Sequence, residues 1–392
     1  MDNYLRPGAL AGNNCGLSLL SIRPDALSQL SIQLMRRWLY SDGRPKFLYK
    51  HGFFANMTAP VANRQTRSGF VHRIEEACTL NATTNMLKSR STVHKPGRLK
   101  RGARIGVLAT AGIVEPKSLE AGIAAIRAEG FEVELSKRIF DGKGYLAGEP
   151  KERAKELVDF FRRSDIDAIF CARGGFGSMQ MLPYLNSDLK GYPKIFVGYS
   201  DVTVLLNWLR QCCGMVTFHA PMVAMDFARG LSEQSRAHLW PVLSGEIHNW
   251  QLDLGATIRP GQVESELMGG CLSILVTTLG TPYEIDTRGK ILFLEDVGEK
   301  PYRIERMLTH LKMAGKLDHV AGVVFGDFTN CEGEGSRDVR QVIVDLFYDA
   351  TYPVVMGMRA GHGDENLTLP FGAKMVLDGN AATLQLLESP VI

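Results

Sequence analysis

Short apolar runs alternate with amphipathic stretches along much of the chain, beginning near residue 104. Residues 104–110 (RIGVLAT) form an apolar run with the length of a buried strand. Residues 118–130 then repeat apolar positions at helical spacing and end at Gly130. The same order recurs in the strand-like residues 131–136 and the helix-like residues 150–164. Strands that alternate with helices in this way predict a parallel sheet covered by helices.

Two further apolar runs, 166–172 and 194–200, end at turns that could carry chemistry. The first is followed by RGGFGS at 173–178, and the second ends at Ser200, after which a helical pattern begins. In open α/β sheets, ligands bind beyond the carboxyl ends of the strands. We therefore expect both turns to line a site.

The pattern becomes less regular after about residue 222 and then resumes as a second module. Residues 226–264 are interpreted as a linker region with one helical stretch at 231–246. The sequence thus predicts an N-terminal α/β domain at 96–225 and a C-terminal domain at 265–392. In the second domain we expect a helix after a Gly269-Gly270 turn, strands at 290–299, 320–328 and 352–358, a helix at 301–315, and a closing hairpin turning at Asp378-Gly379-Asn380.

Residues 1–95 differ in charge from the remainder of the chain. The first 100 residues contain 15 basic and 5 acidic residues, although the whole chain has a net charge of only +3. Such a segment suits a targeting peptide, a nucleic-acid-binding arm or a disordered extension. No aromatic or helical recognition pattern accompanies the charge, so nucleic acid is not an expected partner. We interpret 1–95 as a disordered leader or a start assigned too far upstream, with Met86 as the sensible start.

Composition restricts the class of protein and its compartment. The 392 residues are 45% hydrophobic and 22% charged, which is typical of a soluble globular protein. No apolar window is long enough to span a membrane. The seven cysteines form no CxxC pair or Cys/His cluster, which suggests reduced thiols and no zinc site. We expect a cytoplasmic protein without a metal or cofactor.

Ser200 is the first candidate for chemistry. A serine between a strand and a helix is exposed, and the helix start favours negative charge. The backbone N–H of Asp201 would then stabilise an oxyanion, as at a nucleophile elbow. The second glycine of the usual GxSxG pattern is missing here. The alternative interpretation is that Ser200 only caps the following helix.

The RGG turn is the second candidate. Gly174 and Gly175 would let the backbone approach a ligand closely, and Arg173 could hold a carboxylate with a bidentate fork. The spacing matches neither a Walker A loop nor GxGxxG, so a phosphate loop is not supported. A purely structural tight turn remains the alternative.

Acids and a histidine follow at two later strand ends. Glu295 has Asp296 and Glu299 close by, so the three acids could bind a divalent cation, cap the next helix or simply be solvated. A single carboxylate at this position could instead orient a histidine.

His362, between two glycines, is the histidine that best fits this role, and His219 is the other candidate. As a metal site, His362 and Asp364 would be too few ligands, and a surface histidine remains the plain alternative. Together, Ser200, Glu295 and His362 form a plausible nucleophile, orienting acid and base.

Several ordered blocks resemble one known family. From about residue 94 onward the chain is similar to the serine LD-carboxypeptidases, the muramoyltetrapeptide carboxypeptidase family. The blocks that carry the resemblance are KPGRLKRGARIGVLA, YLAGEPKERAKEL, FCARGGFGSMQMLPYL, GYSDVTVLLNWL, TFHAPM, GTPYEIDTRGKILFLEDVGEKPYRIERML and GHGDENLTLPFGA.

The resemblance implies roles for individual residues. Ser200 would be the nucleophile, Glu295 the charge-relay acid and His362 the base. The oxyanion hole would use the amide of Asp201 and one amide of the RGG turn, that of Gly174 or Gly175. The family fold has an α/β N-terminal domain and a smaller, β-rich C-terminal domain, with the site in the cleft between them.

The resemblance also implies a metal-independent reaction and a partner. The substrate would be a peptidoglycan tetrapeptide whose bond between meso-diaminopimelate or lysine and a terminal D-alanine is cleaved during cytoplasmic cell-wall recycling. The enzyme would be a homodimer that needs neither nucleic acid nor a membrane.

Two departures from the family pattern concern the surroundings of the site. Ala109-Thr110-Ala111 replaces the usual Ala-Pro-Ser, and Cys271 follows Gly269-Gly270 where asparagine is common. One alternative function is therefore a related peptidase that cleaves another conjugate, such as a peptidyl-nucleotide antibiotic, for self-immunity. A second alternative is a non-catalytic module that binds an anion at the RGG turn and the helix start.

Overall fold

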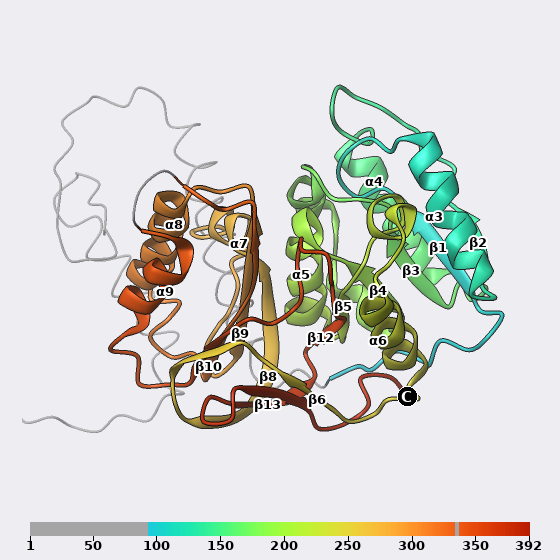
Figure 1. Cartoon of the computed structure of the whole chain (residues 1–392). Coiled ribbons are helices and arrows are strands. Elements are labelled where there is room, and N and C mark those ends of the chain that lie inside the picture. The colour runs from blue at the N-terminus through green and yellow to red at the C-terminus, as the bar shows by residue number, and fades with distance from the viewer. Residues whose placement is uncertain (1–92, 334–336) are drawn as a thin grey trace, which may run out of the picture. The chain divides into compact units, whose positions relative to one another are not determined.

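A computed structural model of the chain describes residues 93–333 and 337–392. The expectations for the basic leader, including nucleic-acid binding, fall on residues 1–92 and lie outside the described residues. Within the described ranges the protein is a mixed α/β structure with two sheets (Figure 1). No helix in these ranges has the length and apolar character needed to cross a membrane.

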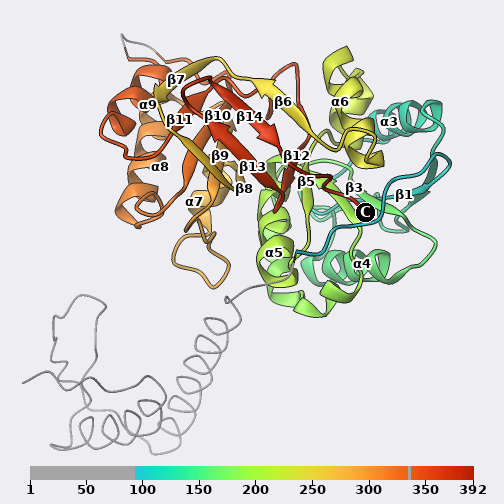
Figure 2. The same cartoon turned by 90° about the horizontal axis from the view of Figure 1, so that it is seen from below.

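The first sheet has six strands, and its parallel part confirms the predicted α/β class. Strands β1 to β5 run parallel, and β12 joins the edge in the antiparallel direction next to β5 (Figures 1 and 2). In spatial order the strands are β12 (Leu369–Phe371), β5 (Thr217–His219), β4 (Ile195–Gly198), β3 (Ala168–Cys171), β1 (Arg104–Leu108) and β2 (Glu132–Leu135).

Amphipathic helices cover this sheet as their apolar spacing predicts. In α3 (Pro116–Ala128) the residues Leu119, Ile123 and Ile126 recur every three or four positions and are buried. Their burial provides the main stabilisation of the helix, because each large apolar side chain contributes about 1.5–3 kcal/mol. The other helices of this part are α4 (Pro150–Arg162), α5 (Thr203–Cys213) and α6 (Glu233–Ser244).

The second sheet has eight strands and lies in the C-terminal part of the chain. Its central strands β8, β9, β10 and β11 are parallel, whereas β7, β13, β14 and β6 pair antiparallel. In spatial order the strands are β6 (Trp250–Asp253), β14 (Thr383–Leu386), β13 (Lys374–Asp378), β8 (Gln262–Cys271), β9 (Ile291–Val297), β10 (Gly322–Thr329), β11 (Val354–Met356) and β7 (Ala256–Arg259). The predicted closing hairpin is confirmed as β13 and β14.

Three helices share a hydrophobic cluster with β9 and β10 of this sheet. Two of them were expected near their observed positions, and the third was not predicted. They are α7 (Leu272–Thr277), α8 (Pro301–Met313) and α9 (Val339–Phe347).

The Gly269-Gly270 pair does not form a turn before α7, so that prediction is wrong. Both glycines belong to β8, with φ values of 138° and 125°. A Cβ atom at Gly269 would overlap the carbonyl oxygen of Phe293 in the neighbouring strand. The pair therefore allows two backbones to approach closely, which a local pattern does not distinguish from a turn.

Helix α5 lies between the two sheets and connects their cores (Figure 1). The side-chain amide of Asn207 donates to the carbonyl oxygen of Gly269 at 2.7 Å and accepts from its N–H at 3.3 Å. Arg210 forms a 2.8 Å ion pair with Glu266, in which the arginine side chain is almost fully buried. These contacts fix the elements that carry the candidate site.

Candidate active site

Ser200 occupies a strained turn at the end of β4. Its φ is 59°, in the left-handed region that non-glycine residues rarely adopt. Such a conformation costs about 1–3 kcal/mol and is concentrated at functional sites. Ser200 starts the short 3₁₀ turn Ser200–Val202, and α5 follows at Thr203. This is the geometry of a nucleophile elbow.

The interpretation of Ser200 as a helix cap is wrong. The N-cap position of α5 belongs to Val202, and no side chain of the described residues caps this helix start. The strain at Ser200 therefore has no capping hydrogen bond to explain it.

Gly174 of the RGG turn lies directly against the serine. A Cβ atom built on Gly174 would be 3.0 Å from both Cβ and Oγ of Ser200 and 3.5 Å from the backbone nitrogen of Asp201. A larger residue at this position would therefore crowd the hydroxyl. The carbonyl oxygen of Gly174 points elsewhere, because it accepts a 3.2 Å hydrogen bond from the N–H of Gly112.

The Arg173 side chain braces the turn. Its Nη1 donates to the carbonyl oxygen of Ile113 at 3.1 Å, and its Nε donates to that of Gly174 at 3.3 Å. The guanidinium thus ties the RGG turn to the loop that follows β1. Its role in binding a substrate carboxylate stays a prediction.

Glu295 and His362 form a hydrogen-bonded pair. Nδ1 of His362 lies 2.7 Å from Oε2 of Glu295, which is fully buried near the end of β9. Gly361 has a φ of 124°, and a Cβ atom there would be 2.6 Å from the same carboxylate oxygen. A glycine before the histidine is therefore needed to bring its ring to the acid.

The pair shifts the pKa values of both groups. Burial lowers the pKa of His362, but the hydrogen bond and charge of Glu295 outweigh this effect, so the net pKa is raised. Burial raises the pKa of Glu295, and the hydrogen bond from His362 opposes it without reversing it. Oε1 of Glu295 has no hydrogen-bond partner among the described residues.

Tyr199 links the serine segment to the histidine segment. Its ring centroid lies 4.9 Å from that of His362 in an edge-on arrangement. The tyrosine is buried, and its hydroxyl donates to Asp226 at 3.1 Å. The residue immediately before Ser200 thus packs on the imidazole. Sequence reasoning did not identify this contact, because a tyrosine beside a serine is a common local pattern.

His219, the other candidate histidine, lies in the core behind Tyr199. Its ring centroid is 5.6 Å from that of Tyr199 and 5.2 Å from that of Phe293. Complete burial lowers its pKa to about 3, so it is neutral at physiological pH. Neither ring nitrogen has a hydrogen-bond partner among the described residues.

The two acids near Glu295, Asp296 and Glu299, bind different partners. Asp296 accepts a 2.7 Å hydrogen bond from the N–H of Ser273, and Glu299 forms a 3.3 Å ion pair with Arg303. Within the part of the chain that the structure describes, no group of three or more His, Cys, Asp or Glu side chains is arranged to hold a metal ion.

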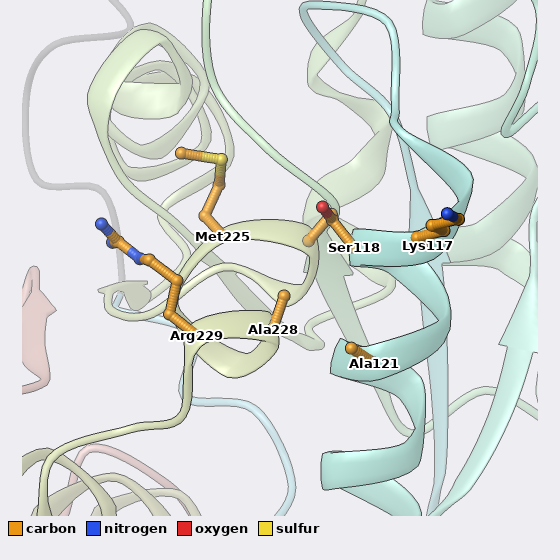
Figure 3. Close-up of a pocket in the computed structure, with 7 residues that line it drawn as sticks. Lys117, Ser118, Ala121, Met225, Ala228 and Arg229 are labelled. Carbon is orange, nitrogen blue, oxygen red and sulfur yellow. The ribbon is translucent and has the colours of Figure 1, made fainter.

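A cavity of about 410 Å³ lies apart from these residues, between the start of α3 and the π-helical turn Val223–Phe227. Figure 3 shows Lys117, Ser118 and Ala121 on one side and Met225, Ala228 and Arg229 on the other. None of the predicted site residues lines it. Arg229, which lines the cavity, pairs with Asp226 at 2.9 Å, and Asp226 accepts the hydrogen bond of Tyr199.

A half-buried serine on a strained turn at the end of a parallel strand is the arrangement of serine-dependent hydrolases. Comparison with known families agrees. Residues 105–220 match the LD-carboxypeptidase N-terminal domain, and residues 264–377 match the LD-carboxypeptidase C-terminal domain. The chain therefore belongs to the LD-carboxypeptidase family and is a serine-type carboxypeptidase.

Individual relatives support this assignment. The chain is 39% identical over 293 residues to a probable murein peptide carboxypeptidase of Bacillus subtilis, covering 73% of this chain and 92% of the relative. It is 30% identical over 290 residues to a murein tetrapeptide carboxypeptidase of Pseudomonas aeruginosa, covering 71% and 94%.

Solved structures agree with the fold. A muramoyltetrapeptide carboxypeptidase from Oxalobacter formigenes superimposes with a TM-score of 0.67 at 30% identity, over 72% of this chain and 98% of that chain. The microcin C7 self-immunity protein MccF superimposes with a TM-score of 0.72 at 24% identity, over 76% and 100%.

Proposed function

We propose that the protein releases the terminal D-alanine from a peptidoglycan tetrapeptide by means of Ser200, Glu295 and His362. The observation that carries this proposal is the buried Glu295–His362 pair, which packs against the residue preceding a strained serine. The murein peptide substrates named for two relatives support the substrate class.

In the first step, His362 acts as the base. Its Nδ1–H donates to Glu295, which fixes the tautomer and leaves Nε2 to accept the proton of Ser200 Oγ. Ser200 attacks the carbonyl carbon that precedes the terminal D-alanine. Glu295 stabilises the imidazolium that forms.

The oxyanion of the tetrahedral intermediate is stabilised by two backbone N–H groups. One belongs to Asp201 at the helix start, and the other comes from the Gly174–Gly175 pair. A trans peptide group points its N–H away from its C=O. Since the carbonyl of Gly174 faces Gly112, the N–H of Gly175 points away from Gly112 and is the favoured donor. Loss of one such donor typically costs about a hundredfold to a thousandfold in rate.

The intermediate then collapses with cleavage of the amide bond. His362 gives its proton to the leaving nitrogen, so free D-alanine departs and an acyl-enzyme on Ser200 remains. Water, deprotonated by His362, attacks the ester and releases the shortened peptide. When this second intermediate collapses, His362 returns the proton to Ser200 Oγ.

The compartment, the oligomeric state and the cellular process are inferred from the family resemblance. The proposed enzyme is a cytoplasmic homodimer that takes part in recycling of cell-wall peptides. The reaction as written needs no metal or cofactor.

A second candidate function is hydrolysis of a peptide conjugated to a nucleotide. Phe176 of the RGG turn and Tyr145 are both exposed, and their ring centroids lie 5.9 Å apart. An exposed aromatic pair next to the site could stack on a base. MccF, a microcin C7 self-immunity protein of Escherichia coli, is 27% identical over 305 residues.

A competition assay distinguishes the two substrates. The enzyme is given equal amounts of an LD-tetrapeptide and a peptidyl-nucleotide, and both products are measured by mass spectrometry. Preferential release of D-alanine supports the murein function, and preferential cleavage of the nucleotide conjugate supports the second candidate. A tetrapeptide ending in L-alanine is the stereochemical control.

A further inference from the structure

The side chain of Asp201 turns inward, directly after the candidate nucleophile. The residue is 3% exposed. Its Oδ2 accepts a 2.8 Å hydrogen bond from the N–H of Ser178, at the end of the RGGFGS turn. The N–H of Gly177 also donates to it. The residue after the nucleophile therefore holds the turn that lies against the nucleophile.

Arg153 of α4 is buried beside the same turn and is 3% exposed. Burial raises the pKa of Asp201, whereas the hydrogen bonds from Ser178 and Gly177 and the charge of Arg153 oppose that shift. One guanidinium nitrogen donates to the carbonyl oxygen of Thr110 after β1, and the other donates to Gln180 at 3.3 Å. A Cβ atom at Gly177 would be only 2.8 Å from the guanidinium, so this glycine is needed for the arginine to fit.

The resulting network joins the ends of three strands. Thr110 follows β1, Ser178 follows β3 and Asp201 follows β4, and the hydroxyl groups of Thr110 and Ser178 lie 3.3 Å apart. Three of the four residues at 174–177 are glycines, which have unusual backbone freedom. Such a turn keeps one geometry only if surrounding contacts hold it.

We propose that Asp201 is a positioning residue whose carboxylate fixes the RGG turn against Ser200 and so sets the spacing of the two oxyanion donors. This inference rests on the proposed function. It assigns the side chain of Asp201 a role separate from that of its backbone N–H.

Energetics favour this role over a purely stabilising one. A buried charged group adds little net stability, because removing it from water costs about as much as its partners return. Oxyanion donors, in contrast, are effective only when they are held in place before the reaction. A displacement of about 1 Å can reduce the rate about a hundredfold.

The test separates transition-state binding from substrate binding. In Asp201→Ala, kcat for D-alanine release should fall about 10–100-fold, while KM stays within about twofold. A peptide aldehyde, which forms a tetrahedral adduct with Ser200, should lose affinity by the same factor as kcat. Binding of intact tetrapeptide should be equal in Ser200→Ala and in the double variant Ser200→Ala/Asp201→Ala.

Two further variants complete the test: a matched control, and a substitute in case Asp201→Ala does not fold. Asp159→Ala removes an exposed aspartate of α4 and should leave all these values unchanged. If Asp201→Ala does not fold, the double variant Arg153→Gln/Asp201→Asn removes both charges together and leaves none buried alone. The asparagine side chain still offers an amide oxygen to the N–H groups of the turn, as a weaker acceptor than the carboxylate. We therefore expect kcat to fall with KM unchanged, but by a smaller factor than in Asp201→Ala.

The outcomes distinguish this inference from the proposed function. An active wild-type enzyme whose folded Asp201 variants keep full kcat overturns the positioning role. A folded variant that loses substrate affinity and kcat by the same factor also overturns it. Absence of D-alanine release by the wild-type enzyme overturns the proposed function instead.

Discussion

Nδ1 of His362 lies 2.7 Å from Oε2 of Glu295, and the carboxylate is completely shielded from water. In this arrangement Nδ1 carries the proton and Nε2 is left as the basic nitrogen. The imidazole therefore has a fixed orientation before substrate arrives. The proposed reaction depends on this pair and on its position beside the serine segment.

The raised pKa of His362 predicts an acid limb in the pH profile. Catalysis needs the neutral imidazole, so kcat/KM should fall as the pH drops through the pKa of His362. Because the pKa is raised, the midpoint should lie above 6.5, the ordinary value for histidine. Steady-state rates between pH 5 and 9 provide the measurement. A profile that stays flat down to pH 5.5 would contradict a role for His362 as the base.

Replacement of Glu295 by glutamine should affect both rate and pH dependence. Without the carboxylate charge the imidazolium loses its stabilisation, and kcat should fall about a thousandfold to ten-thousandfold. The hydrogen bond and charge of Glu295 are the largest effects that oppose burial, so the pKa of His362 should fall without them and the residual acid limb should move to lower pH. The control is Glu299→Gln in the same segment, which should keep normal kinetics. An unchanged midpoint in Glu295→Gln would contradict the assigned coupling.

The strain at Ser200 predicts that glycine at this position stabilises the fold relative to alanine. Ser200→Gly and Ser200→Ala should both be inactive, because each lacks the hydroxyl. Glycine accepts a φ of 59° without cost, so Ser200→Gly should be more stable than Ser200→Ala by about 1 kcal/mol. Urea unfolding at pH 7.5 measures the difference. Equal or reversed stabilities would show that the turn is not strained.

His219 should contribute to acid sensitivity. Its pKa is about 3 in the folded protein and about 6.5 when unfolded, so the unfolded state binds the extra proton between these values. Stability is therefore complete above pH 6.5 and decreases as the pH falls towards 3. Between pH 7.5 and 5.5, His219→Phe should lose about 1.4 kcal/mol less stability than the wild type.

The control for this measurement is an exposed histidine. His248→Gln should leave the loss of unfolding free energy between pH 7.5 and 5.5 as in the wild type. If His219→Phe shows the same pH dependence as the wild type, His219 is not buried in its neutral form.

The sequence predicted those parts of the fold whose signals are local. The strand at 194–200 and the helix after it follow from an apolar run and an amphipathic repeat. Strand β12 was not predicted, because its three residues carry no period and are defined only by pairing with β5. Gly269-Gly270 was misassigned because the close approach to β9 is a long-range contact.

In the candidate site, too, the residues with local sequence signals could be predicted, and the contacts made by distant segments could not. Ser200, Glu295 and His362 could be proposed as site residues because each stands at the end of a predicted strand within a family-like block. The contact of Tyr199 with His362 and the inward side chain of Asp201 depend on how distant segments pack. Arg153 appears in the sequence as one charge among several on an amphipathic helix, and only the packing of α4 shows that it is buried.

The most direct test of the account is to measure D-alanine release from an LD-tetrapeptide by the full chain and by its Ser200→Ala variant. Ser187→Ala, which replaces an exposed serine outside the proposed site, serves as the control. We predict release by the wild type and by Ser187→Ala, and loss of at least about a thousandfold in Ser200→Ala. Release that persists in a folded Ser200→Ala variant would contradict the assignment of this serine as the nucleophile.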